Sequence, residues 1–262
     1  MSTAQFLTSA WVWSPLGLGC GGMALLAYFW RFGWSGRAWW MLSAVGVFLL
    51  TLMSPLAALA QGYLFSAHMA QHILLVLAVP ALALMALPET AEVPRAIARV
   101  LNPAVCWACG VGAMWVWHVP ALCDAAARSR GVSAVQTVTL LALGGAFWWQ
   151  LLAPRPRERI APLHGVVYLF AACTACTVLG IILTFSPVTV CRAYLTPVDR
   201  LGIEPMIYGT WGMTAARDQQ VGGLIMWVPM CMVYLGAIFG QLGRWYGEPA
   251  GAALGGRAMR SQ

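Results

Sequence analysis

The stretch HMAQHILLVLAVPALALMALPE, residues 68–89, decides the fold, because its composition is that of a membrane-spanning helix. A helix that crosses a bilayer needs about 20 predominantly apolar residues, and this run supplies them. The run nevertheless opens with His68 and His72, and hydrocarbon disfavours imidazole. Residues four apart lie on one face of a helix. The stretch therefore predicts a membrane helix whose first turn carries two histidines side by side, either in the headgroup layer or around a shared ligand.

The composition extends this prediction to the whole chain. Of its 262 residues, 61% are hydrophobic and 9% are charged, and the mean hydropathy is +0.75. Soluble domains carry roughly 25% charged residues. We therefore predict an all-α fold, a polytopic membrane helix bundle in which residues 1–262 form a single integral membrane domain. Seven transmembrane helices are expected, at about residues 15–30, 38–60, 68–87, 103–119, 132–152, 162–187 and 221–242.

The arginines predict the orientation of the bundle. All fifteen basic residues are Arg, and short cytoplasmic loops are enriched in basic residues. The loops after the first, third and fifth predicted spans and the C-terminal tail hold ten of them: Arg31, Arg37, Arg95, Arg99, Arg155, Arg157, Arg159, Arg244, Arg257 and Arg260. The opposite side holds five: Arg128, Arg130, Arg192, Arg200 and Arg217. The N-terminus is thus expected outside and the C-terminus in the cytoplasm.

The net charge of +7 is consistent with this placement, because the loop arginines would face an anionic lipid bilayer. Nucleic-acid binding would require a basic surface on a recognisable binding module, and the sequence contains none. We therefore expect the bilayer, and no nucleic acid, as a partner.

This topology brings four polar side chains to the outer face. His68 and His72 begin the third span, and His118, in WVWHVPALCD, ends the fourth. Asp218, in RDQQVGG, precedes the seventh span. Three imidazoles and a carboxylate form a ligand set that suits copper or zinc, so we expect a metal site here. Softer ligands close by would favour cuprous copper: Met69, Met206, Met213, Cys123 and Cys191.

A purely structural interpretation of the same residues stays open. Histidine is amphipathic and is tolerated at a membrane interface without a ligand. Asp218 in the first turn would accept hydrogen bonds from the free N–H groups of the seventh helix. Pro120 and Asp124 would end one helix and cap a short one. Cys123 and Cys191 fall near segment ends, where a disulfide is the alternative to a metal site.

Four stretches resemble the CtaG-type cytochrome c oxidase assembly factors, a family of bacterial membrane proteins with seven predicted spans. They are HMAQHILLVLAVPALALMALP, WHVPALCDAA, LGIILTFSP and DQQVGGLIMWVP, which follow the family order along the third, fourth, sixth and seventh spans. The resemblance implies a multi-pass protein of the bacterial cytoplasmic (inner) membrane that matures a haem–copper oxidase by helping copper reach its metal centre. The implied partners are the oxidase subunits, with a soluble periplasmic copper donor as a further candidate. Carried over by motif, the functional positions are His68, His72, His118, Asp218 and Gln219.

The chain departs from the family pattern in the fifth span, which opens in the family with His, Glu and a second His. Those places hold Ser133, Gln136 and Thr137 here, and Cys123 stands where a tyrosine is common. Three interpretations remain open. The site binds copper with three histidines and one carboxylate, or it uses sulfur from cysteine or methionine, or the protein is a metal-free scaffold for oxidase assembly.

Two other functions compete with assembly. A haem-binding electron carrier would use His118 with His68 or His72 as axial ligands, but these histidines crowd one membrane edge. A transporter would place ionisable residues near the midplane, and the span centres contain no Asp, Glu or Arg. No Ser-His-Asp arrangement or phosphate-binding loop suggests catalysis. We therefore expect an assembly factor that is not an enzyme.

Overall fold

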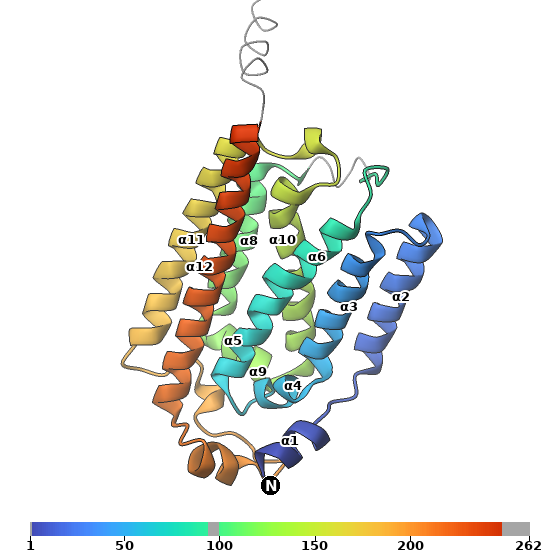
Figure 1. Ribbon diagram of the computed structural model, residues 1–262. Coiled ribbons are helices and arrows are strands. Elements are labelled where there is room, and N and C mark those ends of the chain that lie inside the picture. Colours follow the sequence, from blue (N-terminus) through green and yellow to red (C-terminus); the bar gives the residue numbers. More distant parts are fainter. Residues whose placement is uncertain (1, 94–99, 248–262) are drawn as a thin grey trace, which may run out of the picture.

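The computed structural model describes residues 2–93 and 100–247, and the regular elements in those residues are all helices (Figure 1). Of the described residues, 78% are helical, so the predicted all-α fold class is confirmed. The α-helices are α1 (Thr3–Ser9), α2 (Pro15–Phe32), α3 (Ala38–Met53), α4 (Pro55–Ala60), α5 (Phe65–Ile73), α6 (Val79–Ala86), α8 (Pro103–Trp117), α9 (Pro120–Arg128), α10 (Arg130–Leu152), α11 (Pro162–Phe185) and α12 (Ala215–Gly247). Shorter π-helical and 3₁₀ turns are η1 (Leu74–Ala78), η2 (Pro156–Glu158), η3 (Arg192–Tyr194) and η4 (Pro205–Thr210).

The long helices run side by side between two ends of the bundle (Figure 1). We call the end with α1, α4 and α9 the lower end. The opposite end, formed by the turns at residues 33–37, 87–93 and 153–161, is the upper end. The N-terminus lies at the lower end and the last turn of α12 at the upper end (Figure 1).

Several of these helices are long and apolar enough to cross a membrane. Within the described residues they are Phe65–Ala86, which joins α5, η1 and α6, together with α10, α11 and α12. A fifth is obtained if α8 and α9 count as one bent span. Four or five stretches of the predicted bundle are thus candidate membrane spans by their length and composition. Because α2, with 18 residues, and α3, with 16, are not in this group, seven spans and the orientation of the termini stay predictions.

The predicted second span, residues 38–60, is wrong as one continuous helix. α3 ends at Met53, and α4 starts at Pro55. A proline disfavours the helical conformation of the residue before it, and Ser54 is extended, with φ −75° and ψ 172°. Pro55 then occupies the first position of α4, where its missing N–H costs nothing. The break leaves α4 folded across the lower end, next to α5.

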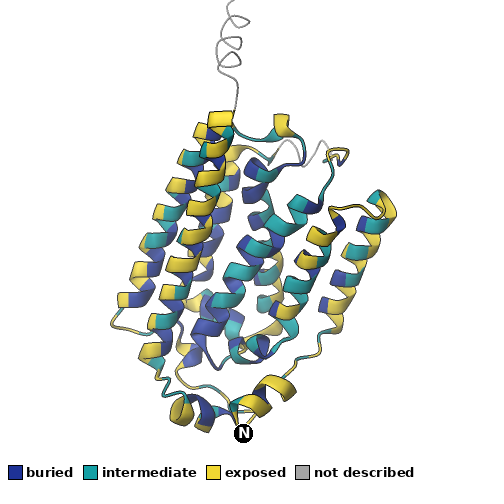
Figure 2. Cartoon of the chain, in the orientation of Figure 1, coloured by how far each residue is buried: buried dark blue, intermediate teal, exposed yellow. Residues whose placement is uncertain are grey.

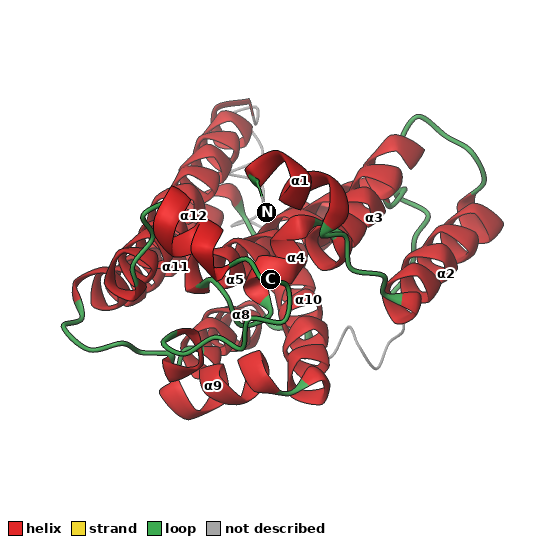
Figure 3. Ribbon diagram, turned by 90° about the horizontal axis from the view of Figure 1, so that it is seen from below, coloured by secondary structure: helices red, strands yellow, loops and turns green. Residues whose placement is uncertain are grey.

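The predicted fourth span turns sharply where it reaches the lower end. α8 ends at Trp117, and α9 continues from Pro120 at an angle of 74°. Val119, which precedes the proline, is extended, with φ −61° and ψ 127°. Figure 3 shows α9 lying across the end of the bundle. The bend leaves His118 at the corner between the two helices.

The third span contains a wide π-helical turn, η1, which begins two residues after His72. Pro80 has no N–H to donate to the carbonyl of Val76, and in a regular helix its ring would clash with that carbonyl. Wide turns of this kind relieve such clashes and occur frequently at functional sites. Gly144 of α10 lies against the same turn, because a Cβ added to it would be 2.5 Å from the Val76 carbonyl oxygen. The two helices therefore pack backbone to backbone beside the histidines.

Burial is arranged as expected for a protein surrounded by lipid (Figure 2). Large apolar side chains project from the outer faces of the helices, among them Leu16, Trp30, Phe170 and Phe239. The buried polar and charged side chains are Thr51, Ser66, His68, His72, His118, Gln136, Gln150, Thr184, Asp218, Gln219 and Gln241. Polar residues at membrane depth generally face a bundle interior, and this bundle follows that rule.

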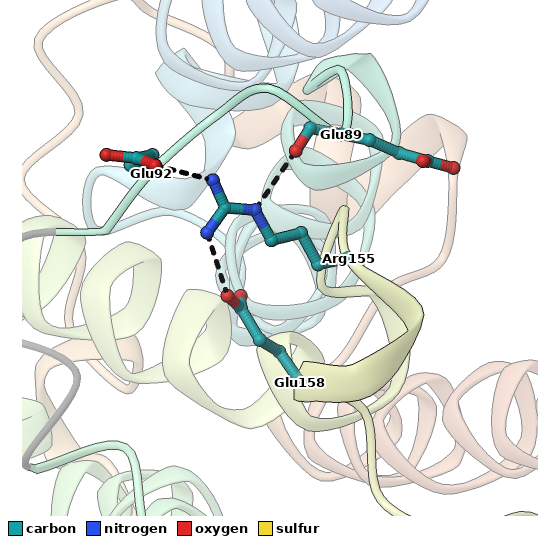
Figure 4. Close-up of polar contacts among 4 residues, drawn as sticks. All are labelled: Glu89, Glu92, Arg155 and Glu158. Atoms are coloured by element: carbon teal, nitrogen blue, oxygen red, sulfur yellow. Dashed lines mark hydrogen bonds and ion pairs between the residues drawn. The ribbon is translucent and has the colours of Figure 1, made fainter.

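At the upper end, Arg155 ties the turn after α6 to the turn after α10 (Figure 4). Its Nη2 lies 2.9 Å from a carboxylate oxygen of Glu92, and its Nη1 lies 3.6 Å from one of Glu158. Its Nε donates a hydrogen bond to the backbone carbonyl of Glu89 at 3.1 Å. One guanidinium thus holds two turns together outside the apolar part of the bundle.

The described arginines divide between the two ends as predicted. The upper end holds Arg31, Arg37, Arg155, Arg157, Arg159 and Arg244, and the lower end holds Arg128, Arg130, Arg192, Arg200 and Arg217. Arg95, Arg99, Arg257 and Arg260, which also entered the prediction, lie outside the described residues. Which end faces the cytoplasm stays a prediction.

Candidate metal centre

Three imidazoles meet inside the lower end of the bundle. His68 and His72 lie one turn apart on α5, and their Nε2 atoms are 3.0 Å apart. The ring of His118 has its centroid 5.3 Å from that of His72. The exposed fractions of the three residues are 5%, 1% and 5%. They therefore lie in the protein interior and are covered by other residues of the bundle, while their role as metal ligands stays a prediction.

His118 faces the sulfur of Met69. The Nδ1 of His118 contacts the backbone carbonyl of Met114, an acceptor, so in the neutral ring Nδ1 carries the proton. Nε2 then presents its lone pair, and it lies 3.1 Å from the Sδ of Met69, which is also an acceptor. Imidazole nitrogen and thioether sulfur both bind cuprous copper, so this pair has the chemistry of a soft-metal site.

Two buried polar atoms beside the histidines have no hydrogen-bond partner among the described residues. They are the Nδ1 of His72 and the Nε2 of Gln136, on α10. The Gln136 side chain, 3% exposed, interacts with the His72 ring. A buried polar atom left unpaired costs about 1–3 kcal/mol. Such atoms mark places where a ligand or an ordered water is expected.

The donors are arranged as two adjacent pairs and not as a closed cage. Among the described residues, no three His, Cys, Asp or Glu side chains converge closely enough to hold one ion as they stand. One pair is His68 with His72, and the other is His118 with Met69. An ion bound by both pairs would require rotation of these side chains.

Asp218, predicted as the fourth ligand, lies at the start of α5. Its Oδ2 accepts a hydrogen bond from the N–H of Phe65 at 2.6 Å, and its Oδ1 accepts one from the N–H of Ser66 at 3.0 Å. These are two of the N–H groups that a helix leaves unpaired at its first turn. Asp218, which lies on α12, therefore caps the start of α5 at Phe65, three residues before His68. Its role as a metal ligand stays a prediction.

The residues after Asp218 fix its helix against two neighbours. Gln219 accepts a hydrogen bond from the N–H of Val190 at 2.8 Å and donates one to the carbonyl of Val188 at 3.1 Å. A Cβ on Gly222 would lie 2.5 Å from the Phe65 ring. A Cβ on Gly223 would overlap the backbone of α11 at Thr184. The DQQVGG motif thus sets the distances among α5, α11 and α12.

A covalently closed loop covers the cluster from below. Cys123 and Cys191 form a disulfide, with their Cα atoms 5.7 Å apart, so as thiols they are not available to a metal in this form. Asp124 accepts a hydrogen bond from the N–H of Ala193 at 2.8 Å. Tyr194 follows, with its ring centroid 5.9 Å from that of His68, and its hydroxyl donates to the carbonyl of Ala60.

The environment of Tyr194 shows how tightly the loop is packed. Burial, and then the carboxylates of Asp218 and Asp124, raise the pKa of its hydroxyl. The phenol therefore stays protonated and keeps donating to the carbonyl at the end of α4. Of the two roles that the sequence leaves open for Cys123 and Cys191, the structure shows the disulfide, whereas the packing of Tyr194 against His68 is not predicted from the sequence.

The remaining candidate residues lie away from the imidazoles or at their margin. Met206 and Met213 belong to a separate apolar cluster around α4 and η4. Ser133 and Thr137 are half-buried on α10, where the Thr137 hydroxyl donates to the Ser133 carbonyl at 2.9 Å. Of the three departures from the family pattern, only Gln136 is buried against the cluster.

The comparisons with known proteins agree with the resemblance seen in the motifs. Residues 23–248 match the family described as cytochrome c oxidase caa3 assembly factor (Caa3_CtaG). No curated protein and no solved structure matches the chain. The match covers the described helices from the middle of α2 to the end of α12, together with the three histidines. The chain belongs to the family of cytochrome c oxidase caa3 assembly factors.

Proposed function

We propose that this protein binds copper at His68, His72 and His118 and passes it to cytochrome c oxidase during assembly. Met69 supplies a soft ligand beside His118. The observation that carries the proposal is the meeting of two buried donor pairs, His68 with His72 and His118 with Met69. In this proposal Asp218 holds α5 so that the two histidines on it keep their positions.

The donor set favours cuprous copper over divalent ions. Neutral imidazole and thioether ligands suit a soft monovalent ion. Asp218, the carboxylate that lies at the start of the helix carrying His68 and His72, already accepts hydrogen bonds from two backbone N–H groups. Burial of an uncompensated charge is costly, and the cost rises with the charge of the ion. The chemistry is binding and release by ligand exchange, so the protein need not be an enzyme.

The proposed location is the bacterial cytoplasmic membrane, with the lower end outside. Two observations support this orientation. Basic residues of short loops favour the cytoplasmic side, and the upper end is rich in arginine. The disulfide of Cys123 and Cys191 lies at the lower end, and disulfides persist in oxidising compartments. A soluble periplasmic copper donor and the immature oxidase subunits would then meet the protein on this side.

The proposal is tested by deleting the gene and restoring it with variants at limiting copper. We expect the wild-type gene to restore oxidase activity and a gene with His68→Ala and His72→Ala to fail, although its product accumulates in the membrane. The matched control is His164→Ala, since His164 is exposed at the upper end. If added copper rescues the double variant, the defect lies in copper supply. Full activity of the double variant at limiting copper would refute the copper role and leave a metal-free scaffold.

A further inference from the structure

A pocket opens at the upper end, far from the histidines along the bundle. It lies where α3 begins and where α6 and α10 end, and its volume is about 410 Å³. This is within the range of roughly 300–1,000 Å³ that is typical of small-molecule sites. Its lining consists of Arg37, Trp40, Leu84, Met85, Leu152, Pro154 and Arg159. Two guanidinium groups therefore share one opening with a row of apolar side chains.

The charge in this pocket is positive and is not neutralised by an ion pair among the described residues. Arg37 contacts backbone carbonyls of Met85 and Leu87, both at 3.4 Å. Arg159 donates to the carbonyl of Ala153 at 2.6 Å. Arg155 engages the carboxylates of Glu92 and Glu158 in the neighbouring turns (Figure 4), whereas from Glu89 it takes only the backbone carbonyl.

The positive charges of the arginines at this opening also repel one another. Burial lowers the pKa of the Arg159 guanidinium, and the positive charges of Arg244 and Arg37 lower it further, while Glu89 opposes them. Arg159 lies in the turn between α10 and α11, outside the candidate spans. Like charges gathered at one opening create a positive potential that attracts an anion.

The apolar part of the lining points to the other half of the ligand. Leu84 and Met85 end α6, and Leu152 ends α10, so they lie where the apolar helices give way to polar turns. Trp40, 41% exposed, is of the residue type that collects at membrane interfaces. A free inorganic anion would gain nothing from these side chains, whereas an amphipathic anion would use both halves of the pocket.

We propose that this pocket binds one anionic phospholipid, with its phosphate on Arg37 and Arg159 and its acyl chain along Leu84, Met85 and Leu152. Basic pockets between membrane helices on the cytoplasmic side bind anionic headgroups in this way. The lipid would join α3, α6 and α10 at the upper end, where the sequence places the cytoplasm. This site is independent of the copper proposal.

The test titrates the detergent-solubilised protein with phosphatidylglycerol and follows its thermal unfolding. Phosphatidylcholine and inorganic phosphate, each added alone, are the other two arms. We expect only phosphatidylglycerol to raise the unfolding temperature of the wild type. Arg37→Gln and Arg159→Gln should each weaken the lipid about tenfold, the usual loss when a charge-assisted contact is removed. The matched control is Arg157→Gln, an exposed arginine of the same turn that does not line the pocket.

The outcomes that would overturn the proposal are distinct. An equal response to phosphatidylcholine would refute a role for the arginines, and a full response to inorganic phosphate would refute the lipid. The same titration midpoint in the wild type and in Arg37→Gln would refute the site. Because Arg37 is exposed, its variant is expected to fold, and phosphatidylglycerol copurified with each variant gives a second measurement. Wild type and Arg157→Gln should retain it, and the two pocket variants should lose it.

Discussion

Asp218 accepts hydrogen bonds from the N–H groups of Phe65 and Ser66, so the last span fixes the start of the helix that carries His68 and His72. A carboxylate at the beginning of a helix satisfies unpaired N–H groups and interacts favourably with the helix dipole. Here the acid comes from α12 and the capped helix is α5. The position of the two imidazoles therefore depends on a residue 150 positions away from His68 along the chain.

Substitution of Asp218 by Asn keeps the size of the side chain but removes its charge and one acceptor. We expect Asp218→Asn to lower the unfolding free energy by about 1–3 kcal/mol, because a buried N–H of α5 loses its partner. Thermal unfolding in detergent measures this. The control is Gln220→Ala, two residues along the same helix and exposed. A loss for Gln220→Ala as large as that for Asp218→Asn would contradict the capping role.

At this scale the sequence predicts which residues gather but not what each of them does. The four-residue spacing of His68 and His72 predicts a shared face, and His118 follows from the pairing of adjacent spans. The chemistry of Asp218 is the same for a ligand and for a cap, so its capping bonds could not be predicted without the position of α5. Likewise, nothing in the composition of the fifth span indicates that Gln136 would be buried against His72 while Ser133 and Thr137 lie at the margin.

Among elements, the packing of α10 against the wide turn η1 sets the depth of the histidine pair. Gly144 permits this contact, because a Cβ there would approach the Val76 carbonyl oxygen to 2.5 Å. The neighbouring Gly145 has nothing within 4 Å of its own added Cβ. Gly144 and Gly145 are adjacent in the same helix and differ in their neighbours: Gly144 lies against the backbone of η1, and Gly145 has no neighbouring atom close to its added Cβ.

This pair gives a controlled prediction. Gly144→Ala should push α10 away from η1 and lower stability by about 1–3 kcal/mol, as overpacking does. Gly145→Ala should be neutral or stabilising by up to about 1 kcal/mol, because alanine favours helix. Thermal unfolding of the two variants distinguishes them. Equal stabilisation by both would show that the close approach at Val76 does not exist.

The contacts of Arg155 predict a local effect of pH at the upper end. The Arg155 guanidinium beside Glu92 lowers the pKa of that carboxyl from its ordinary 4.5. The contact is therefore fully present above pH 4.5 and is lost as the pH falls through the lowered value. At neutral pH we expect the amides of residues 87–93 to exchange faster in Arg155→Gln than in the wild type. On acidification of the wild type we expect their protection, taken relative to the intrinsic exchange rate at each pH, to fall. Arg157→Gln is the control. If residues 87–93 exchange as fast in Arg157→Gln as in Arg155→Gln, Arg155 does not hold the two turns together.

The sequence predicts most of the long helices, but it predicts only some of the breaks and bends within them. Apolar runs of more than 20 residues predict the helices α10, α11 and α12, since burial of a helix in lipid requires them. Pro55 is the signal for the break in the second run, and the prediction of one span over residues 38–60, which follows hydropathy, misses it. The bend between α8 and α9 depends on Pro120, which the sequence shows. It also depends on free space for α9 across the lower end, and that space is a property of the whole fold.

At the scale of the whole molecule, the disulfide joins α9 to the loop between α11 and α12 over the histidine cluster. The two cysteines are separated by 68 residues, and the loop-entropy relation gives up to about 4 kcal/mol for a ring of this size. We expect Cys123→Ser with Cys191→Ser to unfold at lower temperature and to expose Tyr194. Cys20→Ser is the control, because Cys20 is exposed and forms no disulfide. An unchanged unfolding temperature in the double variant would show that the bridge does not close the lower end.

The account depends most directly on copper binding by the imidazoles and Met69. The decisive measurement is a competition titration of purified protein with cuprous copper, followed by X-ray absorption of the loaded protein. We expect stoichiometric binding with nitrogen and sulfur ligands in the wild type and in His164→Ala. Met69→Leu, which conserves core volume, should lose the sulfur ligand and bind at least about tenfold more weakly. His68→Ala with His72→Ala should bind no copper, and equal binding by this variant and the wild type would contradict the account.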